Sequence, residues 1–332
     1  MPNPLLSICI PTYNRAIYLR DCLAVLIPQL KEAKAEIELI ISDNDSTDAT
    51  REVVADAARE FPLSYSKNAQ NVGACKNIAR VVEDLAGGEY CWMIGDDDLV
   101  RPGGVRAILA AIQANPDLDY FFVNYAIHDA SEKAAHVASG RFSQGLYLGN
   151  RTPETGRIAD WSRLIGEDEY ALVALWAHVF RRQKWIEHTI SEKIRDHYAN
   201  VEGTYPQTLI LAQFLVGQEV YRIAQPWVSV YHGQASWLKY EPLIVLKRFP
   251  ELLDRLAAAG VSERELSRHR RRIRSISGEP VLELLLGRSL EGLNRGDALS
   301  FGARHFFRGA FVRSLLRAIG KKLRSSLRLP SR

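Results

Sequence analysis

The chain lacks any apolar run near the roughly 18 to 20 residues needed to cross a bilayer, and no basic stretch precedes its first apolar segment. It therefore predicts neither a membrane-spanning helix nor a cleavable secretion signal. Its four cysteines also lack the close paired spacing of a zinc site, and Cys9 and Cys91 lie inside apolar runs. This pattern is typical of reduced packing cysteines, so we expect a cytoplasmic protein.

Internal repeats are also absent, and the composition of the 332 residues, 47% hydrophobic and 25% charged, excludes a fibre or a disordered tail. Short apolar runs alternate with amphipathic stretches near 16–30, 47–60, 76–86 and 104–114. This alternation predicts an α/β fold with a mixed, mostly parallel sheet flanked by helices. The expected strands are Leu6–Ile10, Ile37–Ile41, Leu63–Ser66, Tyr90–Ile94 and Tyr120–Tyr125.

Polar segments follow four of these strands. They are Pro11–Arg15, Asp43–Asp48, Asn68–Asn77 and the triplet Asp96-Asp97-Asp98. Ligands of parallel sheets collect beyond the carboxyl ends of the strands, so we expect these four loops to form one site.

The acidic triplet concentrates negative charge at the end of a buried strand. Like charges this close raise one another's pKa or bind a cation. The only basic residue nearby in sequence is Arg101, and Pro102-Gly103-Gly104 indicates a loop after it. We therefore expect a divalent metal, with solvated turn residues as the alternative.

The second half of the chain has weaker patterns. We expect a strand over Ala171–Phe180, a helix over Pro206–Val216, and a closing pair of strands, Val220–Ile223 and Trp227–Tyr231. Residues 128–168, rich in Gly, Ser and charge, indicate a variable insertion that forms a lid near the site. From Pro242 onward the pattern predicts a helical extension.

The end of the chain is strongly basic. No acidic residue follows Asp297, whereas nine lysines and arginines do; residues 1–297 carry 34 basic and 39 acidic residues, a net charge of −5. Apolar residues recur there at helical spacing: Phe311, Val312, Leu315, Leu316, Ile319, Leu323 and Leu327. We expect a basic amphipathic helix that binds an anionic membrane surface. The alternatives are a helix packed on the core and a nucleic-acid patch, although aromatic residues are not interleaved with the basic ones.

Four segments together resemble family 2 glycosyltransferases, which have the GT-A fold. They are Ser7–Arg15, Ile40–Asp48, Asn71–Asn77 and Gly95–Asp98 with the following Pro102-Gly103. Ser42–Thr47, Gly95 and Thr204–Gln207 are most similar to the abequosyltransferase-type branch, which builds surface polysaccharides. The resemblance implies a GT-A domain over 1–235, divided into a nucleotide-binding half (1–125) and an acceptor-binding half (126–235), and a helical extension over 236–332.

The resemblance also assigns residues to the nucleotide-sugar donor. Pro11, Thr12, Tyr13 and Arg15 occupy the positions where the family contacts base and ribose, with a simple strand-to-helix turn as the alternative. Asp43 would accept a hydrogen bond from a uracil or thymine imide. The alternative for its loop is a helix cap by Ser46 and Thr47.

Asn71 and Lys76 lie in the segment that the family places near the diphosphate. The family usually has arginine at the Lys76 position, and lysine keeps the charge but loses the bidentate fork.

The acidic triplet departs from the common family pattern, because Gly95 stands where the first aspartate is expected. We assign Asp96 or Asp97 to the ribose, and Asp98, with Asp96 as a second ligand, to Mg²⁺ or Mn²⁺. His232 is a further candidate metal or phosphate ligand, with a structural histidine as the alternative.

The resemblance implies inversion by direct displacement, with a carboxylate base that deprotonates the acceptor. The family places this base in a Glu-Asp pair before a helix, but here Gly203 follows Glu202. Glu202 is the preferred candidate, followed by Asp196 and the cluster Glu167-Asp168-Glu169.

The expected function is transfer of a sugar from a nucleoside diphosphate donor to a lipid-linked saccharide acceptor. We expect the protein at the inner face of the cytoplasmic membrane, and we expect no nucleic-acid partner. One alternative is a catalytically degenerate, membrane-associated scaffold, which the missing Glu-Asp pair favours. Another is a dehalogenase-like phosphatase with Asp96 as nucleophile, but that motif normally ends the first strand of its domain. A sugar-nucleotide pyrophosphorylase would need a Gly-rich loop near the start, which Pro11–Arg15 is not.

Overall fold

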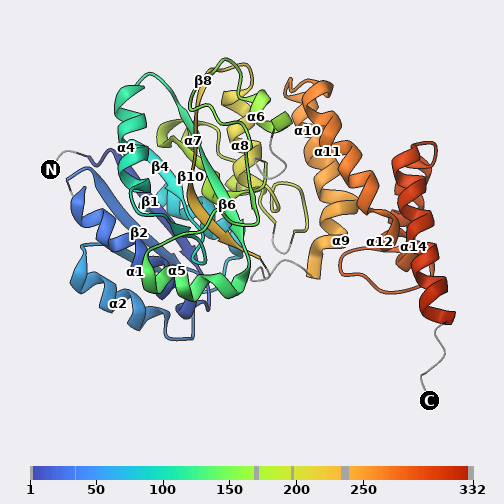
Figure 1. The fold of residues 1–332 in the computed structure, drawn as a ribbon, viewed down its shortest axis with the longest axis horizontal. Helices are drawn as coiled ribbons and strands as arrows, with labels where there is room; N and C mark the ends of the chain where they lie inside the picture. The colour runs from blue at the N-terminus through green and yellow to red at the C-terminus, as the bar shows by residue number, and fades with distance from the viewer. Residues whose placement is uncertain (1–2, 34, 168–171, 196–197, 233–238, 328–332) are drawn as a thin grey trace.

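The computed structural model describes residues 3–33, 35–167, 172–195, 198–232 and 239–327. Its centre is one mixed sheet of ten strands in the order β3-β2-β1-β4-β9-β6-β10-β5, with β7 beside β6 and β8 beside β10 (Figure 1). The strands are β1 (Leu6–Thr12), β2 (Ile37–Asp43), β3 (Ser64–Lys67), β4 (Tyr90–Met93), β5 (Leu99–Val100), β6 (Tyr120–His128), β7 (Tyr147–Leu148), β8 (Gly156–Ile158), β9 (His178–Arg181) and β10 (Val220–Tyr231).

Most strands of the sheet point the same way. β1 is parallel to β2 and β4, and β2 is parallel to β3. β9 is antiparallel to both β4 and β6, so β6 runs parallel to β4, and β10 runs parallel to β6. The carboxyl ends of β1, β2, β3, β4, β6 and β10 therefore lie along one edge of the sheet, where the predicted site loops begin.

Helices cover the sheet because their apolar residues recur at helical spacing. In α1, for example, Leu19, Leu23, Leu26 and Leu30 are buried. The helices of this part are α1 (Ala16–Glu32), α2 (Thr50–Glu60), α3 (Ala74–Arg80), α4 (Gly104–Ala114), α5 (Lys133–Ser139), α6 (Ser162–Glu167), α7 (Arg182–Glu187) and α8 (Pro206–Leu215).

The C-terminal helices extend beyond one end of the sheet (Figure 1). The Nε2 atom of His269 lies 2.6 Å from the backbone oxygen of Ile165, which ties this extension to α6. Gly278 lets the last helix approach closely, because a Cβ there would lie 2.3 Å from the backbone carbon of Ser314. The helices are α9 (Glu241–Leu243), α10 (Phe249–Ala258), α11 (Glu263–Ile276), α12 (Gly278–Leu285), α13 (Arg295–His305) and α14 (Gly309–Leu327).

The predicted fold class is confirmed, and the five predicted strands match β1 to β4 and β6 within a few residues. Two expectations for the second half were wrong. Val220–Ile223 and Trp227–Tyr231 do not pair with each other; they are one strand, β10, with a register shift between Ile223 and Val228. Of the strand expected over 171–180, only the end is a strand, β9, which begins at His178; a 3-10 turn, Leu175–Ala177, precedes it. Residue 171 lies outside the described residues.

The apolar residues of the basic tail are partly used for packing. Phe311 and Ala318 of α14 are buried, whereas Leu316, Ile319 and Leu323 remain exposed. None of the described helices combines the length and the apolar character needed to span a membrane.

Candidate functional site

Asp96 is held by two residues of the loop after β1. The Thr12 hydroxyl donates to Asp96 Oδ2 at 2.7 Å, and Arg15 Nε donates to Asp96 Oδ1 at 2.7 Å. The side chain is 7% exposed. Burial raises the pKa of Asp96 to about 6, although the charge of Arg15 lowers it.

Asp97 and Asp98 have different surroundings. The Asp97 side chain is 28% exposed and pairs with Arg15 Nη2. Asp98 is buried and receives one hydrogen bond from the described part of the chain, from the backbone N–H of Gly95 at 3.1 Å. Burial, and then the charge of Asp97, hold the pKa of Asp98 well above its usual range.

Among the described residues, Arg15 and Lys133 bring positive charge to the triplet. Arg15 contacts Asp96 and Asp97, and Lys133 Nζ donates to the backbone oxygen of Asp97 at 3.1 Å. Arg101, the basic residue nearest to the triplet in sequence, has another partner: its Nε donates to Ser229 Oγ at 2.9 Å, across the β5–β10 pair.

Lys133 was missed because it lies in the poorly patterned insertion. Its ammonium is buried, 4.8 Å from the centre of the Tyr18 ring and 5.5 Å from that of Tyr231. The lysine stands in the first turn of α5, and its burial and its hydrogen bond to Asp97 together indicate a role at the acidic loop. No sequence pattern that we know distinguishes it from a surface lysine.

Asp43 ends β2 and has both carboxylate oxygens engaged. It accepts from the backbone N–H of Ser46 at 2.8 Å and from the Tyr65 hydroxyl at 2.6 Å. Asp43 is also 1% exposed, and the following loop turns through Asp45 at φ +70°. Its hydrogen bonds therefore shape the loop, and contact with a nucleobase remains a prediction.

The loops after β1 and β2 brace each other. Asn14, at φ +52°, donates its backbone N–H to Ser46 Oγ at 2.8 Å. Asp48 accepts the backbone N–H of Ala16 at 2.9 Å and so satisfies the start of α1. Tyr13 lies in this braced corner with 42% of its surface exposed, as a residue that stacks on a base requires.

Asn71 and Lys76 lie at the start of α3. Asn71 Oδ1 accepts from Asn44 Nδ2 at 2.8 Å and from the backbone N–H of Gly73 at 2.9 Å. This fixes the turn through Gly73, whose φ of +87° favours glycine. Lys76, half-buried on the following turn, belongs to the same edge of the sheet.

Of the candidate bases, Glu202 and Glu167 fall in the part of the chain that the structure describes. Glu202 precedes α8, is 12% exposed and accepts from Arg255 Nη2 at 2.7 Å, beside a cleft against α10. Asp196 lies outside the described residues, as do Asp168 and Glu169. Glu167 pairs with Arg222 at 2.6 Å.

His232 follows β10 and is exposed, with Nε2 2.8 Å from the Tyr147 hydroxyl. Among the described residues, the triad whose metal-ligating atoms lie within 4.8 Å of one another is His128, Glu132 and His136. Asp96, Asp98 and His232 do not form such a group, so their joint role in metal binding stays a prediction.

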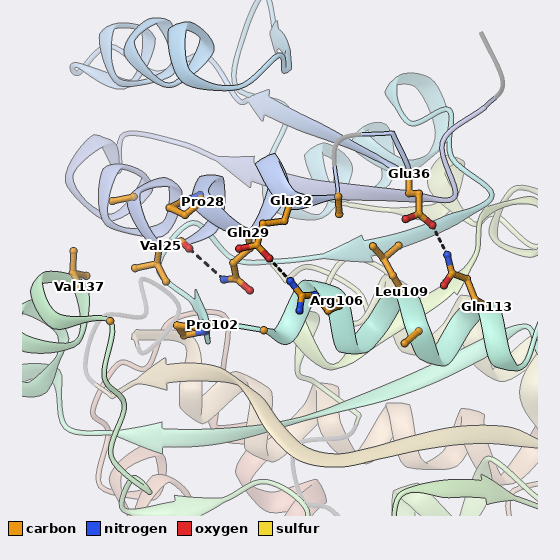
Figure 2. A pocket seen from close by; sticks show the side chains of 15 residues that line it. Val25, Pro28, Gln29, Glu32, Glu36, Pro102, Arg106, Leu109, Gln113 and Val137 are labelled. Carbon is orange, nitrogen blue, oxygen red and sulfur yellow. Dashed lines mark hydrogen bonds and ion pairs between the residues drawn. The ribbon is translucent and has the colours of Figure 1, made fainter.

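A depression of about 480 Å³ between α1 and α4 is separate from these residues (Figure 2). Arg106 points toward Glu32 there, at 2.5 Å, and Gln113 toward Glu36. None of the predicted donor or metal residues lines it, so we do not assign the donor to it.

Comparison with known proteins agrees with this geometry. Residues 7–162, which contain all four loops, match the model of glycosyl transferase family 2. Residues 7–162 are therefore a glycosyl transferase family 2 domain. This assignment is incompatible with the phosphatase interpretation of Asp96.

Individual relatives match this chain only in part. The chain is 38% identical over 117 residues to abequosyltransferase RfbV of Salmonella typhimurium, 34% of each protein. It is 28% identical over 147 residues to GalNAc(5)-diNAcBac-PP-undecaprenol beta-1,3-glucosyltransferase of Campylobacter jejuni, 43% of this chain and 44% of that protein. The matched segments thus span less than half of these relatives.

The fold of this chain resembles solved structures over nearly its whole length. S. aureus TarS 1-349 in complex with UDP-GlcNAc aligns with a TM-score of 0.62 and 15% identity, covering 97% of this chain and 92% of that chain. At this identity the likeness shows the GT-A fold alone.

In the acidic loop, the surroundings of Asp98 suit a hard dication. Asp98 is a buried carboxylate whose protonation burial favours, and a bound cation would remove that cost. Asp97 lies next to it and is partly exposed, whereas Asp96 is already held by Thr12 and Arg15. Asp98 and Asp97 are therefore the residues that would hold Mg²⁺ or Mn²⁺.

Proposed function

We propose that this chain is an inverting, metal-dependent glycosyltransferase that moves a hexose-type sugar from a nucleoside diphosphate donor to a saccharide acceptor. The acceptor is lipid-linked, and the reaction belongs to surface polysaccharide synthesis. One observation carries the proposal: four polar loops begin at the same edge of the sheet, and the loop after β4 carries the buried carboxylate of Asp98. Saccharide-transferring relatives such as the Salmonella abequosyltransferase support it. TarS, crystallised with UDP-GlcNAc, supports a nucleotide-sugar donor.

Different described residues would contact different parts of the donor. Tyr13 offers an exposed ring for the base, Asp97 an accessible carboxylate for the ribose or the metal, and Lys76 a positive charge for the diphosphate. Asp96, Thr12 and Arg15 would keep the acidic loop in place. Asp98 and Asp97 would hold the dication, which would supply Lewis-acid neutralisation of the negative charge on the departing diphosphate.

The transfer itself is a single displacement. A carboxylate takes the proton of the acceptor hydroxyl, its oxygen bonds to the anomeric carbon, and the bond from that carbon to the nucleoside diphosphate breaks with inversion. Glu202 is our candidate base, oriented by Arg255, and Asp196 is the second candidate.

We also place the enzyme at the inner face of the cytoplasmic membrane, where a lipid-linked acceptor would be met. The basic C-terminal extension supports this location, since nine cations and no acid follow Asp297.

Slow hydrolysis of sugar nucleotides with Mn²⁺ tests the proposal. We expect release of the nucleoside diphosphate by the wild type and a loss of at least about a hundredfold in Asp98→Asn, because a metal supplies several kcal/mol of stabilisation. Exposed Asp56→Asn on α2 is the matched control. Equal absence of hydrolysis in all three proteins would instead support the scaffold alternative.

A further inference from the structure

Arginines that are distant in sequence meet where α13 ends and α14 begins. Arg304 and Arg308 flank this junction, and α11 contributes Arg271 and Arg274. α14 crosses the end of α11 closely, with Arg317 Nη2 donating to the backbone oxygen of Ser275 at 3.2 Å. The junction therefore gathers positive charge from two parts of the extension.

These guanidinium groups affect one another and their neighbours. Burial, and then the charges of Arg308, Arg270 and Arg271, lower the pKa of Arg274. Burial, followed by Arg274, Arg304 and Arg308, lowers the pKa of His305 to about 4. The like charges are thus close enough to repel.

Acidic residues of the extension do not relieve this repulsion. Arg270 pairs with Asp254 and Glu263, and Lys321 and Lys322 pair with Glu279 and Glu283. By contrast, four arginines form no ion pair with any residue that the structure describes: Arg271, Arg274, Arg304 and Arg308. An external anion is their available counter-charge.

Large apolar side chains are exposed at the same junction. Phe306 is 57% exposed and Phe307 is 95% exposed, immediately before α14. Along α14, Leu316, Ile319 and Leu323 form an exposed stripe at helical spacing. Exposed aromatic and aliphatic groups beside unpaired cations are typical of a surface that binds a partner.

The charges favour a bilayer over other occupants. A two-fold contact with a second copy would place the same arginines face to face, which is repulsive. A single-stranded nucleic acid would need aromatic residues interleaved with the basic ones, but here both phenylalanines stand at one end. A bilayer offers phosphates to the arginines and a hydrocarbon boundary to the phenyl rings.

We infer that the α13–α14 junction binds an anionic phospholipid surface, with headgroup phosphates on the arginines and the two phenyl rings inserted at the boundary of the acyl chains. We call this set the junction cluster: Arg271, Arg274, Arg304, Arg308, Phe306 and Phe307. The inference deepens the membrane location in the proposed function and rests on it. It specifies the contact as a discrete cluster built from two helices rather than the whole basic tail.

Flotation of the full chain with phosphatidylcholine vesicles, with and without phosphatidylglycerol, tests this. We expect binding only with phosphatidylglycerol, and release at 1 M salt, where the screening length falls from about 10 Å to about 3 Å. The double variants Arg304→Gln/Arg308→Gln and Phe306→Ser/Phe307→Ser should each lower the partition coefficient at least about tenfold. The control Arg51→Gln/Arg59→Gln removes the same charge from α2 and should bind like the wild type.

Unchanged binding by both junction variants, or equal loss in the α2 control, would overturn the inference. Two further outcomes would also overturn it. One is a change from dimer to monomer in the Phe306→Ser/Phe307→Ser variant while vesicle binding stays intact; the other is binding of the chain to nucleic acid without binding to vesicles. Sugar-nucleotide hydrolysis in solution separates the two proposals, since the junction variants should keep the wild-type rate. Flotation by a chain that hydrolyses no donor would support the junction cluster while the proposed activity failed.

Discussion

Three consecutive aspartates with the same chemistry have three different environments. Asp96 is buried under two hydrogen bonds, Asp97 is partly exposed beside Arg15, and Asp98 is buried with no side-chain cation of the described residues in hydrogen-bonding contact. These differences come from the loops that pack around the triplet. They explain why Asp96 holds the loop in place, and they support our proposal that Asp98 binds a dication.

The raised pKa of Asp96 predicts a pH-dependent stability. Because this pKa is higher in the folded chain, about 6, than in the unfolded chain, the folded state binds more protons between about pH 4 and pH 6. The contribution of Asp96 to the free energy of unfolding should therefore fall by about 2 to 3 kcal/mol across this window and level off above it. Asp96→Asn removes this contribution.

Urea denaturation with EDTA at several pH values checks this prediction. The free energy of unfolding of Asp96→Asn minus that of the wild type should rise from about pH 4 to about pH 6. The exposed Asp56→Asn should show no such trend. A difference that stays flat or falls with pH would show that burial does not control this carboxyl group.

Among structural elements, the short turn between β4 and β5 depends on one glycine. A Cβ at Gly95 would lie 2.6 Å from Asp98 Oδ2 and 3.0 Å from Asp97 Oδ1. Gly95→Ala should therefore displace both carboxylates and weaken Mn²⁺ binding at least about tenfold, with little change in circular dichroism. The presence of glycine where the family has aspartate thus has a steric reason.

Gly302→Ala is the matched control for this change. Nothing lies within 4 Å of a Cβ built at Gly302, and the residue lies in α13. This variant should bind Mn²⁺ like the wild type, as judged by manganese electron paramagnetic resonance. Equal affinity of Gly95→Ala would contradict the steric account.

The sequence predicted the structure best where an apolar run is followed directly by a polar loop. Apolar runs followed by polar loops predicted β1 to β4, and parallel pairing placed those loops at one edge. The strand β10 was divided in the prediction because Ala224, Gln225 and Pro226 interrupt its apolar residues, although the backbone continues through a register shift. Lys133 and the contacts of Arg15 depend on long-range packing, which no local pattern encodes.

At the scale of the whole molecule, charge and apolar surface are distributed unevenly. Residues 1–297 carry a net charge of −5, whereas the remaining tail carries nine positive charges and no negative one. The sheet lies toward one end of the molecule and the C-terminal helices at the other (Figure 1). This distribution of charge supports the proposed contact of the extension with an anionic surface.

The central claim is that Asp98 holds a dication that helps to bind a nucleoside diphosphate. Isothermal titration calorimetry with UDP or dTDP, in the presence and absence of Mn²⁺, measures this directly for the wild type and Asp98→Asn. We predict one nucleotide per chain for the wild type, only when Mn²⁺ is present, and no measurable heat for the variant. Manganese-independent binding, or equal binding by Asp98→Asn, would contradict the account.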